Sequence, residues 1–220
     1  MQRKTVLVAH EVYHVFNRGV GGQPVFSSVR DYQRALDVIQ FYRFRKPQLR
    51  FSFYNRLPDK QREAFLKELE KGKTNVEIIC FCLMPNHVHF LLKNLEDDGI
   101  SKFMANFQNS YAKYLNTKTK RFGTLFQQNF KAVRIESDEQ LIHVSRYIHL
   151  NPVTAYLIEA EDLENYSWSS YPGFVNSQKS SFKKNLVLDQ FKSVANYRNF
   201  VLNQADYQRK LAEIKHLTLE

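Results

Sequence analysis

Two histidines separated by one residue, His87 and His89, are the side chains in this sequence best suited to chemistry. The apolar residues 90–92 that follow predict a β-strand. Because side chains alternate between the two faces of a strand, both imidazoles project to one side while Val88 packs on the other. Two neighbouring imidazoles can hold one divalent metal ion and leave coordination positions open for substrate. The same pair can also be two half-exposed strand histidines, so further residues must decide between these interpretations.

A second set of candidate residues lies on a helix predicted over residues 137–150. Ser137 opens a capping box at its start, and Pro152 is expected to end it and to bias Asn151 away from the helical conformation. Tyr147 and Asn151 are four residues apart, so they share one helix face, and His149 points away from it. If this face looks across the histidine strand, the amide oxygen of Asn151 can bind the metal while Tyr147 stands beside it.

These side chains together suit phosphodiester chemistry. Mixed nitrogen and oxygen ligands fit a hard divalent cation, Mg²⁺ or Mn²⁺, acting as a Lewis acid on a phosphate oxygen. A tyrosine is a useful nucleophile because its phenolate, with a pKa of about 10, is also a good leaving group. Tyr147 can equally be a packing residue, since the chain has 12 tyrosines. Tyr111 and Tyr114 are rival nucleophiles, although their spacing with Phe103 and Phe107 predicts packing.

Composition limits the class of protein. The chain has 220 residues, 43% of them hydrophobic and 14% aromatic, which predicts one substantial folded domain with an appendage. Its formal net charge of +10 favours a polyanionic partner, nucleic acid above all. Cys80 and Cys82 suit neither a disulfide nor a CxxC metal knuckle and indicate a reducing compartment. No apolar run approaches the ~18 residues of a membrane span, so we expect a cytoplasmic protein without a membrane partner.

The pattern of apolar residues predicts alternating strands and helices. Strands are expected at 12–17, 76–83, 87–93 and 126–135, and helices at 31–45, within 46–73, at 101–116, at 137–150 and at about 188–217. The Ser- and Lys-rich stretch 177–184 is expected to be a linker.

Several motifs now point to one family. The segments 84–90 (MPNHVHF) and 147–153 (YIHLNPV) resemble the paired signatures of REP-associated tyrosine transposases, IS200-like members of the single-tyrosine HUH transposase superfamily. Supporting motifs lie at 13–19, 121–127 and 168–171, so the resemblance covers residues 10 to 173 in the family's order. It implies an α+β fold: an antiparallel sheet with helices packed on it in a ferredoxin-like core. It also implies metal-dependent nicking and rejoining of single-stranded DNA at hairpin-bearing sites through a covalent 5′-phosphotyrosine.

Residue by residue, the resemblance makes His87 and His89 the metal-binding pair, Tyr147 the catalytic nucleophile and Asn151 the third metal ligand. It implies single-stranded or hairpin DNA as the partner of a monomer or homodimer. We expect residues 1–175 to form the transposase-like domain, and residues 176–220 a linker and helical tail. The stretch 46–73 lies outside the quoted motifs.

Five basic residues beside or within the motifs are candidates for contact with DNA phosphates, although each can also be a solvated surface charge. They are Arg18, Lys120, Arg121, Lys131 and Arg134. Two other functions remain open beside the transposase. One is a domesticated protein that binds hairpins without cutting them, against which the complete His/His/Tyr/Asn set argues. The other is an unrelated metallohydrolase with water as its nucleophile.

Overall fold

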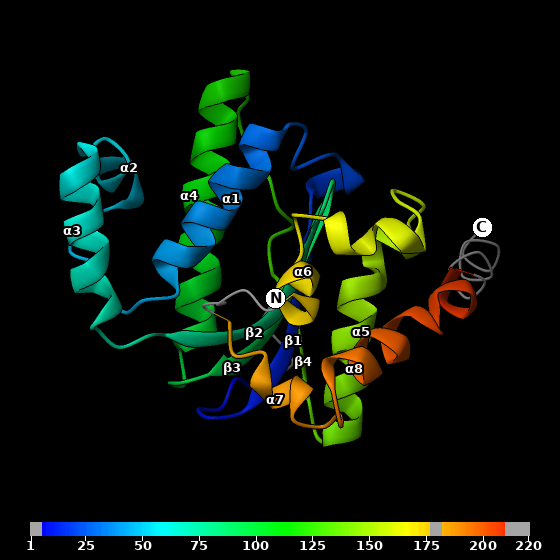
Figure 1. Ribbon diagram of the computed structural model, residues 1–220. Coiled ribbons are helices and arrows are strands. Elements are labelled where there is room, and N and C mark those ends of the chain that lie inside the picture. The colour runs from blue at the N-terminus through cyan, green and yellow to red at the C-terminus, as the bar shows by residue number, and fades with distance from the viewer. Residues whose placement is uncertain (1–5, 177–181, 210–220) are drawn as a thin grey trace.

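A four-stranded antiparallel sheet forms the centre of the protein, which is represented by a computed structural model describing residues 6–176 and 182–209 (Figure 1). The strands are β1 (Val12–Arg18), β2 (Val76–Met84), β3 (His87–Asn94) and β4 (Lys131–Arg134). Their order across the sheet is β2-β3-β1-β4, and every neighbouring pair is antiparallel. With helices between β1 and β2 and a further helix between β3 and β4, this is the ferredoxin-like arrangement. The predicted α+β fold is confirmed.

Helices cover both faces of this sheet (Figure 1). They are α1 (Val29–Tyr42), α2 (Phe51–Tyr54), α3 (Asp59–Glu70), α4 (Gly99–Thr119), α5 (Asp138–Thr154), α6 (Tyr171–Val175), α7 (Asn185–Leu188) and α8 (Val194–Leu202), with short 3-10 helices η1 (Val20–Gly22) and η2 (Ala160–Asn165). On one face lie α1 and α4, with α2 and α3 beyond them. On the other lies α5, with α6, α7 and α8 packed around it.

Alternation along β3 decides which residues meet which layer. Val88 and Phe90 belong to the apolar cluster that includes α1 and α4, whereas Leu91 belongs to the cluster that includes α5. His87 and His89 share the face of Leu91, because side chains two apart on a strand point the same way. Both histidines therefore face α5. On the opposite face, Tyr111 is fully buried among the aromatic rings of α4, as its spacing predicts.

The strand predicted over 126–135 is shorter in the structure, where β4 covers only Lys131–Arg134. Its partner β1 ends at Arg18, where the chain turns into η1, so the residues before 131 have little strand to pair with. A single bridge between Gly19 and Phe126 marks the point where the two segments still meet.

The prediction that Pro152 ends its helix is wrong. Helix α5 continues to Thr154, with Pro152 inside it. Proline removes one backbone donor, but Ala155 N still donates to the carbonyl of Asn151 and Leu157 N to that of Pro152. This end of α5 is buried against the sheet, which offsets the missing bond. Asn151 therefore remains helical and keeps its place one turn after Tyr147.

The single C-terminal helix predicted from about 188 to 217 is also wrong within the described residues. The chain forms α7, a turn, and then α8, which begins where the Ser193 side chain accepts a hydrogen bond from the Asn196 backbone. The remainder of that prediction, from residue 210, and part of the predicted linker, residues 177–181, lie outside the described residues. Val187 and Tyr197 pack in the same apolar cluster as α5. The division of the chain at residue 175 stays a prediction.

Candidate active site

The two histidines lie at the start of β3, an inner strand of the sheet. In the register between β1 and β3, His87 pairs with Arg18 and His89 with Phe16. His89 is buried, with only 5% of the residue exposed, whereas His87 is half-buried. Their ring centroids are 4.9 Å apart and the rings are nearly perpendicular. The alternation predicted from the sequence thus places both imidazoles side by side on one face.

The proton position on His87 follows from its neighbour Asn86. The Asn86 amide nitrogen donates to the carbonyl of Gly22 at 3.1 Å, so the amide oxygen is the atom that faces His87. That oxygen can only accept a hydrogen bond. It lies 2.6 Å from His87 Nδ1, which must therefore carry the proton. The lone pair of the neutral ring is left on Nε2, free to bind a metal ion.

A third histidine, His14 on β1, joins the site and was not assigned a role from the sequence. Its Nε2 lies 2.9 Å from Nδ1 of His89, and the two rings are stacked at 5.1 Å. It occupies the second position of the supporting motif at 13–19, which was the only signal that could have identified it. When His89 Nδ1 donates to His14, the Nε2 atom of His89 is free to bind a metal.

Tyr147 approaches the histidines from α5, across the face of the sheet. Its ring centroid lies 5.5 Å from that of His89 and 5.9 Å from that of His14, edge-on to both. The residue remains 42% exposed, so part of it is open to an external substrate. Asn151, one turn later, donates its amide N–H to the Tyr147 backbone carbonyl at 2.9 Å. The structure therefore brings together all four residues predicted from the sequence.

Burial keeps the site in the protonation state that metal binding requires. It lowers the pKa of His87 to about 4, against a smaller opposing effect of hydrogen bonding with Asn151. Burial also holds the pKa of His89 well below its usual value, helped by repulsion from His14 and His87. Both rings are thus neutral at pH 7. Burial raises the pKa of Tyr147, and a hydrogen bond with Asn151 partly opposes this effect, so the resting side chain is a neutral phenol.

Helix α5 is held in place by a buried polar network behind the site. The ring of His149 bonds to the hydroxyl of Tyr197 on α8 at 2.7 Å and to the Ser170 hydroxyl at 2.8 Å. Ser145, also on α5, lies 3.2 Å from the same Tyr197 hydroxyl. His149 therefore points away from Tyr147 and has a packing and hydrogen-bonding role. Because the network joins α5 to α8, the C-terminal segment helps to fix the orientation of Tyr147.

The donor set fits a metal ion with mixed ligands. Within residues 6–176 and 182–209, no group of three or more His, Cys, Asp or Glu side chains is arranged to hold a metal. Two imidazoles with the amide of Asn151 in hydrogen-bonding range of His87 therefore form the available set. A third ligand must then be an amide oxygen or water, which suits Mg²⁺ or Mn²⁺ better than a metal that prefers thiolates.

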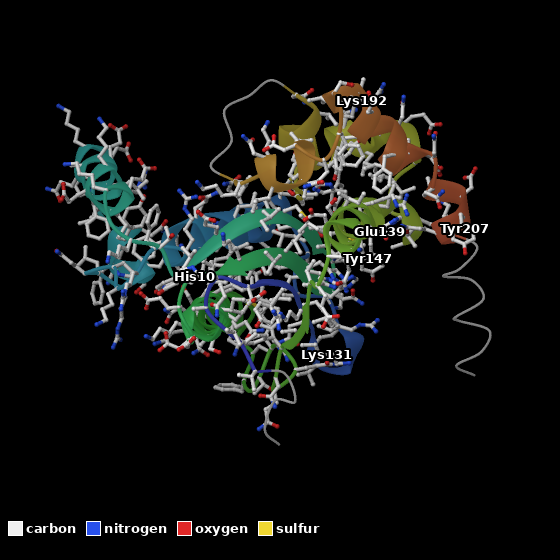
Figure 2. All side chains as sticks on the ribbon, turned by 90° about the horizontal axis from the view of Figure 1, so that it is seen from below. His10, Lys131, Glu139, Tyr147, Lys192 and Tyr207 are labelled. Atoms are coloured by element: carbon white, nitrogen blue, oxygen red, sulfur yellow. The ribbon has the colours of Figure 1, made fainter. Side chains whose placement is uncertain are left out.

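The five basic residues predicted to contact DNA are not equivalent. Lys131 Nζ lies 6.0 Å from the ring of Phe16, which is itself stacked beside His89, so this lysine borders the site (Figure 2). The charge of Arg18 lowers the pKa of His87, which places it nearby as well. Arg134 instead pairs with Glu11 at 2.7 Å. Lys120 and Arg121 follow the end of α4.

The fold and these side chains define a ferredoxin-like domain that carries a histidine pair on a central strand and a tyrosine on the helix facing it. A family model described as "Transposase IS200 like" matches residues 46–151, a segment that contains His87, His89, Tyr147 and Asn151 and also the stretch 46–73. That segment is similar to the IS200-like transposase family, and the resemblance found in the sequence is confirmed.

The chain was also compared with solved structures and with curated proteins. A solved structure of a REP-associated tyrosine transposase bound to a REP hairpin is similar over 80% of this chain and 85% of that one, with 15% sequence identity and a TM-score of 0.48. A likeness of this size carries no argument about function. No curated protein matches the sequence. Among the described residues, no helix is both long and apolar enough to cross a membrane.

Proposed function

We propose that this protein is an IS200-like transposase that nicks and rejoins single-stranded DNA at hairpin-bearing sites, with Tyr147 as nucleophile and a divalent metal ion as cofactor. The observation that supports this proposal is the 5.5 Å approach of the Tyr147 ring to His89, from a helix and a strand far apart in the sequence. A packing tyrosine would be buried, whereas this ring is 42% exposed at the edge of a histidine pair. A phosphodiester entering from solvent can meet both.

In this proposal, His87, His89 and Asn151 hold Mg²⁺ or Mn²⁺, which when bound supplies Lewis-acid activation of a phosphate oxygen. The Tyr147 oxygen attacks phosphorus and forms the phosphotyrosine bond, while the bond from phosphorus to the 3′ oxygen breaks. The phenol proton passes to water, and the departing 3′ oxygen takes a proton to become a hydroxyl. The phosphoester bond is conserved on the 5′ side, so a 3′ hydroxyl can later attack the phosphotyrosine and restore a DNA strand without ATP.

His14 has a positioning role in this scheme. It accepts the Nδ1 proton of His89, which keeps the Nε2 lone pair of His89 available. Asn86 does the same for His87. Both ligands thus have their tautomers set by a neighbouring side chain, which is the usual means of orienting metal-binding histidines. Arg18 and Lys131, which border the histidines, are the two predicted basic residues best placed to contact the phosphates flanking the nick.

The decisive experiment incubates the purified protein with Mn²⁺ or Mg²⁺ and single-stranded DNA from the regions flanking its own gene. We expect a covalent protein–DNA adduct on a denaturing gel, absent with EDTA, and mass spectrometry should map it to Tyr147. Metal-dependent cleavage without any adduct would instead favour the metallohydrolase with a water nucleophile. Hairpin binding with no cleavage under any metal would favour the domesticated binding protein.

A further inference from the structure

The C-terminal segment contacts helix α5 at three levels along its length, and α8 lies alongside that helix (Figure 1). The α5 groups that meet this segment are the side chains of Arg146 and His149 and the carbonyl of Val153. A helix has about 3.6 residues per turn, so these positions lie on the face of α5 opposite to Tyr147 and Asn151. The helix is therefore held from behind, away from the side that carries its chemical groups.

Tyr197 of α8 makes the central contact. Its side chain is fully buried, and its hydroxyl lies 2.7 Å from Nδ1 of His149 and 3.2 Å from the hydroxyl of Ser145. On the other side of the imidazole, Nε2 lies 2.8 Å from the hydroxyl of Ser170. Ser170 in turn accepts a hydrogen bond from the backbone N–H of Phe81 on β2 at 2.9 Å. One continuous chain of hydrogen bonds thus runs from the sheet through α5 to α8.

This chain satisfies both ring nitrogens of His149. The residue is fully buried, and burial lowers the pKa of its imidazole to about 3, so the ring is neutral at pH 7. A neutral imidazole has one donor and one acceptor nitrogen, and a hydroxyl group can pair with either. Loss of the Tyr197 hydroxyl would take the partner from one buried nitrogen, which is costly. Helix α5 would then shift or rotate to recover a hydrogen bond.

Two arginines make the contacts on either side of Tyr197. The guanidinium of Arg146 lies 4.2 Å from the ring centroid of Phe200 on α8. Arg209, from the residues after α8, donates from Nε to the carbonyl of Val153 at 3.0 Å. The last carbonyls of a helix lack partners within it, and a positive charge is favourable there. Arg209 therefore caps α5 at the end where Pro152 removes a backbone donor.

The two halves of the candidate active site have different supports. His87 and His89 belong to the sheet, whereas Tyr147 and Asn151 both move with α5. The Tyr147 ring meets His89 edge-on, with centroids 5.5 Å apart, and 42% of the residue is exposed. Such a contact fixes the ring weakly, so the orientation of α5 decides where the phenol oxygen points. The hydrogen-bond chain through His149 joins the helix to the sheet and sets this orientation.

We propose that Tyr197 and Arg209 are positioning residues for the attack by Tyr147, acting through His149 and through the end of α5. The inference rests on the proposed function in taking Tyr147 as the nucleophile. Both residues lie beyond the segment 46–151 that matches the family model. The C-terminal segment would then control the rate of the covalent step, separately from DNA binding.

The test measures two quantities for each variant. One is the rate constant of adduct formation with Mn²⁺ and saturating single-stranded DNA from the regions flanking the gene. The other is the dissociation constant of the same DNA in EDTA. Tyr197→Phe removes the hydroxyl and keeps the buried ring. It should slow adduct formation by about tenfold or more, since a displacement of about 1 Å can cost 10²-fold. DNA affinity should change less than about twofold, because phosphate contacts dominate it.

Arg209→Gln tests the same idea without changing the buried chain, so it remains informative if Tyr197→Phe folds poorly. It should also slow adduct formation at unchanged DNA affinity. Tyr171→Phe is the matched control, because this buried ring lies 5.3 Å from His149 but its hydroxyl has no hydrogen-bond partner among the described residues. Tyr111→Phe is the control for stability, since it removes a buried hydrogen bond on the other face of the sheet. Both controls should keep the wild-type rate.

A wild-type rate in Tyr197→Phe and in Arg209→Gln would overturn the proposal. Equal slowing in Tyr111→Phe would also overturn it, because the rate would then follow stability alone. A loss of DNA affinity that accounts for the slower reaction would show a binding role instead. Failure of the wild-type protein to form any adduct would contradict the proposed function itself, which is a distinguishable result.

Discussion

The substitution Tyr147→Phe separates catalysis from folding more cleanly than any other in this protein. It removes one oxygen from a ring that is 42% exposed and leaves the ring contacts with His14 and His89 in place. A change of this kind at a partly exposed position should alter the free energy of unfolding by no more than about 0.5 kcal/mol. The loss of a covalent nucleophile, in contrast, should lower the cleavage rate by a factor on the order of 10⁴ or more.

Tyr111→Phe is the matched control with the opposite expectation. Its hydroxyl is buried and donates to the carbonyl of Val25 at 2.8 Å, so the variant leaves a buried acceptor unsatisfied. That loss should destabilise the protein by about 1–2 kcal/mol, or lower its melting temperature by about 2–8 °C. Cleavage of DNA should nevertheless continue, because this ring lies on the other side of the sheet from the histidines.

Both variants are examined by thermal unfolding and by adduct formation with single-stranded DNA and Mn²⁺. We expect Tyr147→Phe to melt like the wild type and form no adduct, and Tyr111→Phe to melt earlier and form it. Persistence of the adduct in Tyr147→Phe would refute the assignment of the nucleophile. Persistence of cleavage without an adduct would show that water attacks the phosphate and would refute the covalent mechanism as a whole.

Three further predictions concern the histidines and the helical layer. His87→Ala or His89→Ala should abolish metal-dependent cleavage and retain hairpin binding, because phosphate charges dominate affinity; unchanged cleavage would remove the metal site. His14→Ala should weaken the affinity of the protein for Mn²⁺ by about 10–100-fold, as measured by electron paramagnetic resonance of free Mn²⁺. An unchanged affinity would show that His14 does not position His89. Burial raises the pKa of Asp31, but hydrogen bonds from its neighbours outweigh this and hold the pKa below its usual value. The contribution of the ionised Asp31 to stability is therefore present above about pH 4 and lost in more acid solution. In Asp31→Asn, the free energy of unfolding, measured by denaturant titration at several pH values, should fall less steeply below about pH 4 than in the wild type.

Much of the site could be predicted from the sequence because it depends on local periodicity. A strand repeats its side-chain direction every two residues, which puts His87 and His89 on one face wherever the strand lies. A helix brings residues four apart together, which pairs Tyr147 with Asn151. The α+β class was implied by the resemblance, but the pattern of apolar residues likewise indicated the main strands and helices. These relations are set within a few residues of chain, so no long-range contact is needed to establish them.

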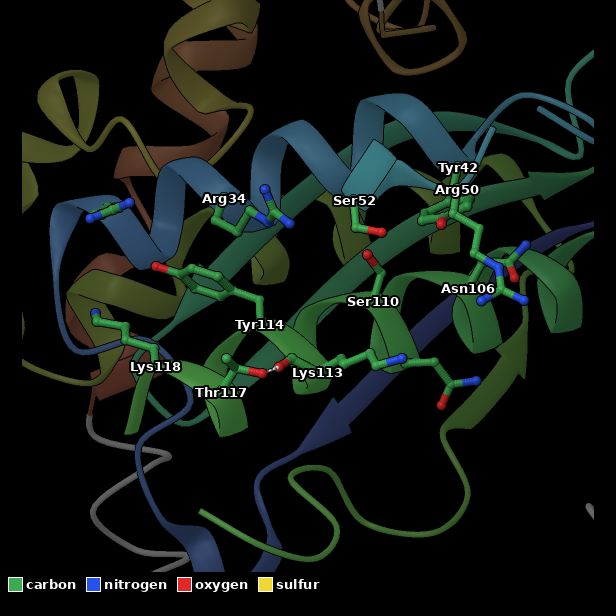
Figure 3. A pocket seen from close by; sticks show the side chains of 12 residues that line it. Arg34, Tyr42, Arg50, Ser52, Asn106, Ser110, Lys113, Tyr114, Thr117 and Lys118 are labelled. Carbon is green, nitrogen blue, oxygen red and sulfur yellow. Dashed lines mark hydrogen bonds between the residues drawn. The ribbon is translucent and has the colours of Figure 1, made fainter. Parts of the chain in front are cut away.

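Tertiary structure decided what depends on partners distant in the chain. His14 meets His89 only because β1 and β3 pair in one register, which burial of the whole sheet selects. Pro152 stays inside α5 because the packing of that helix offsets a local preference that favoured its end. The groove lined by side chains of α1, α4 and the start of α2 (Figure 3), too, exists only where α2 is anchored against α1 and faces α4. In each case the arrangement is stabilised by burial of surfaces that lie far apart in the sequence. Short-range sequence patterns do not predict which of these surfaces will contact one another.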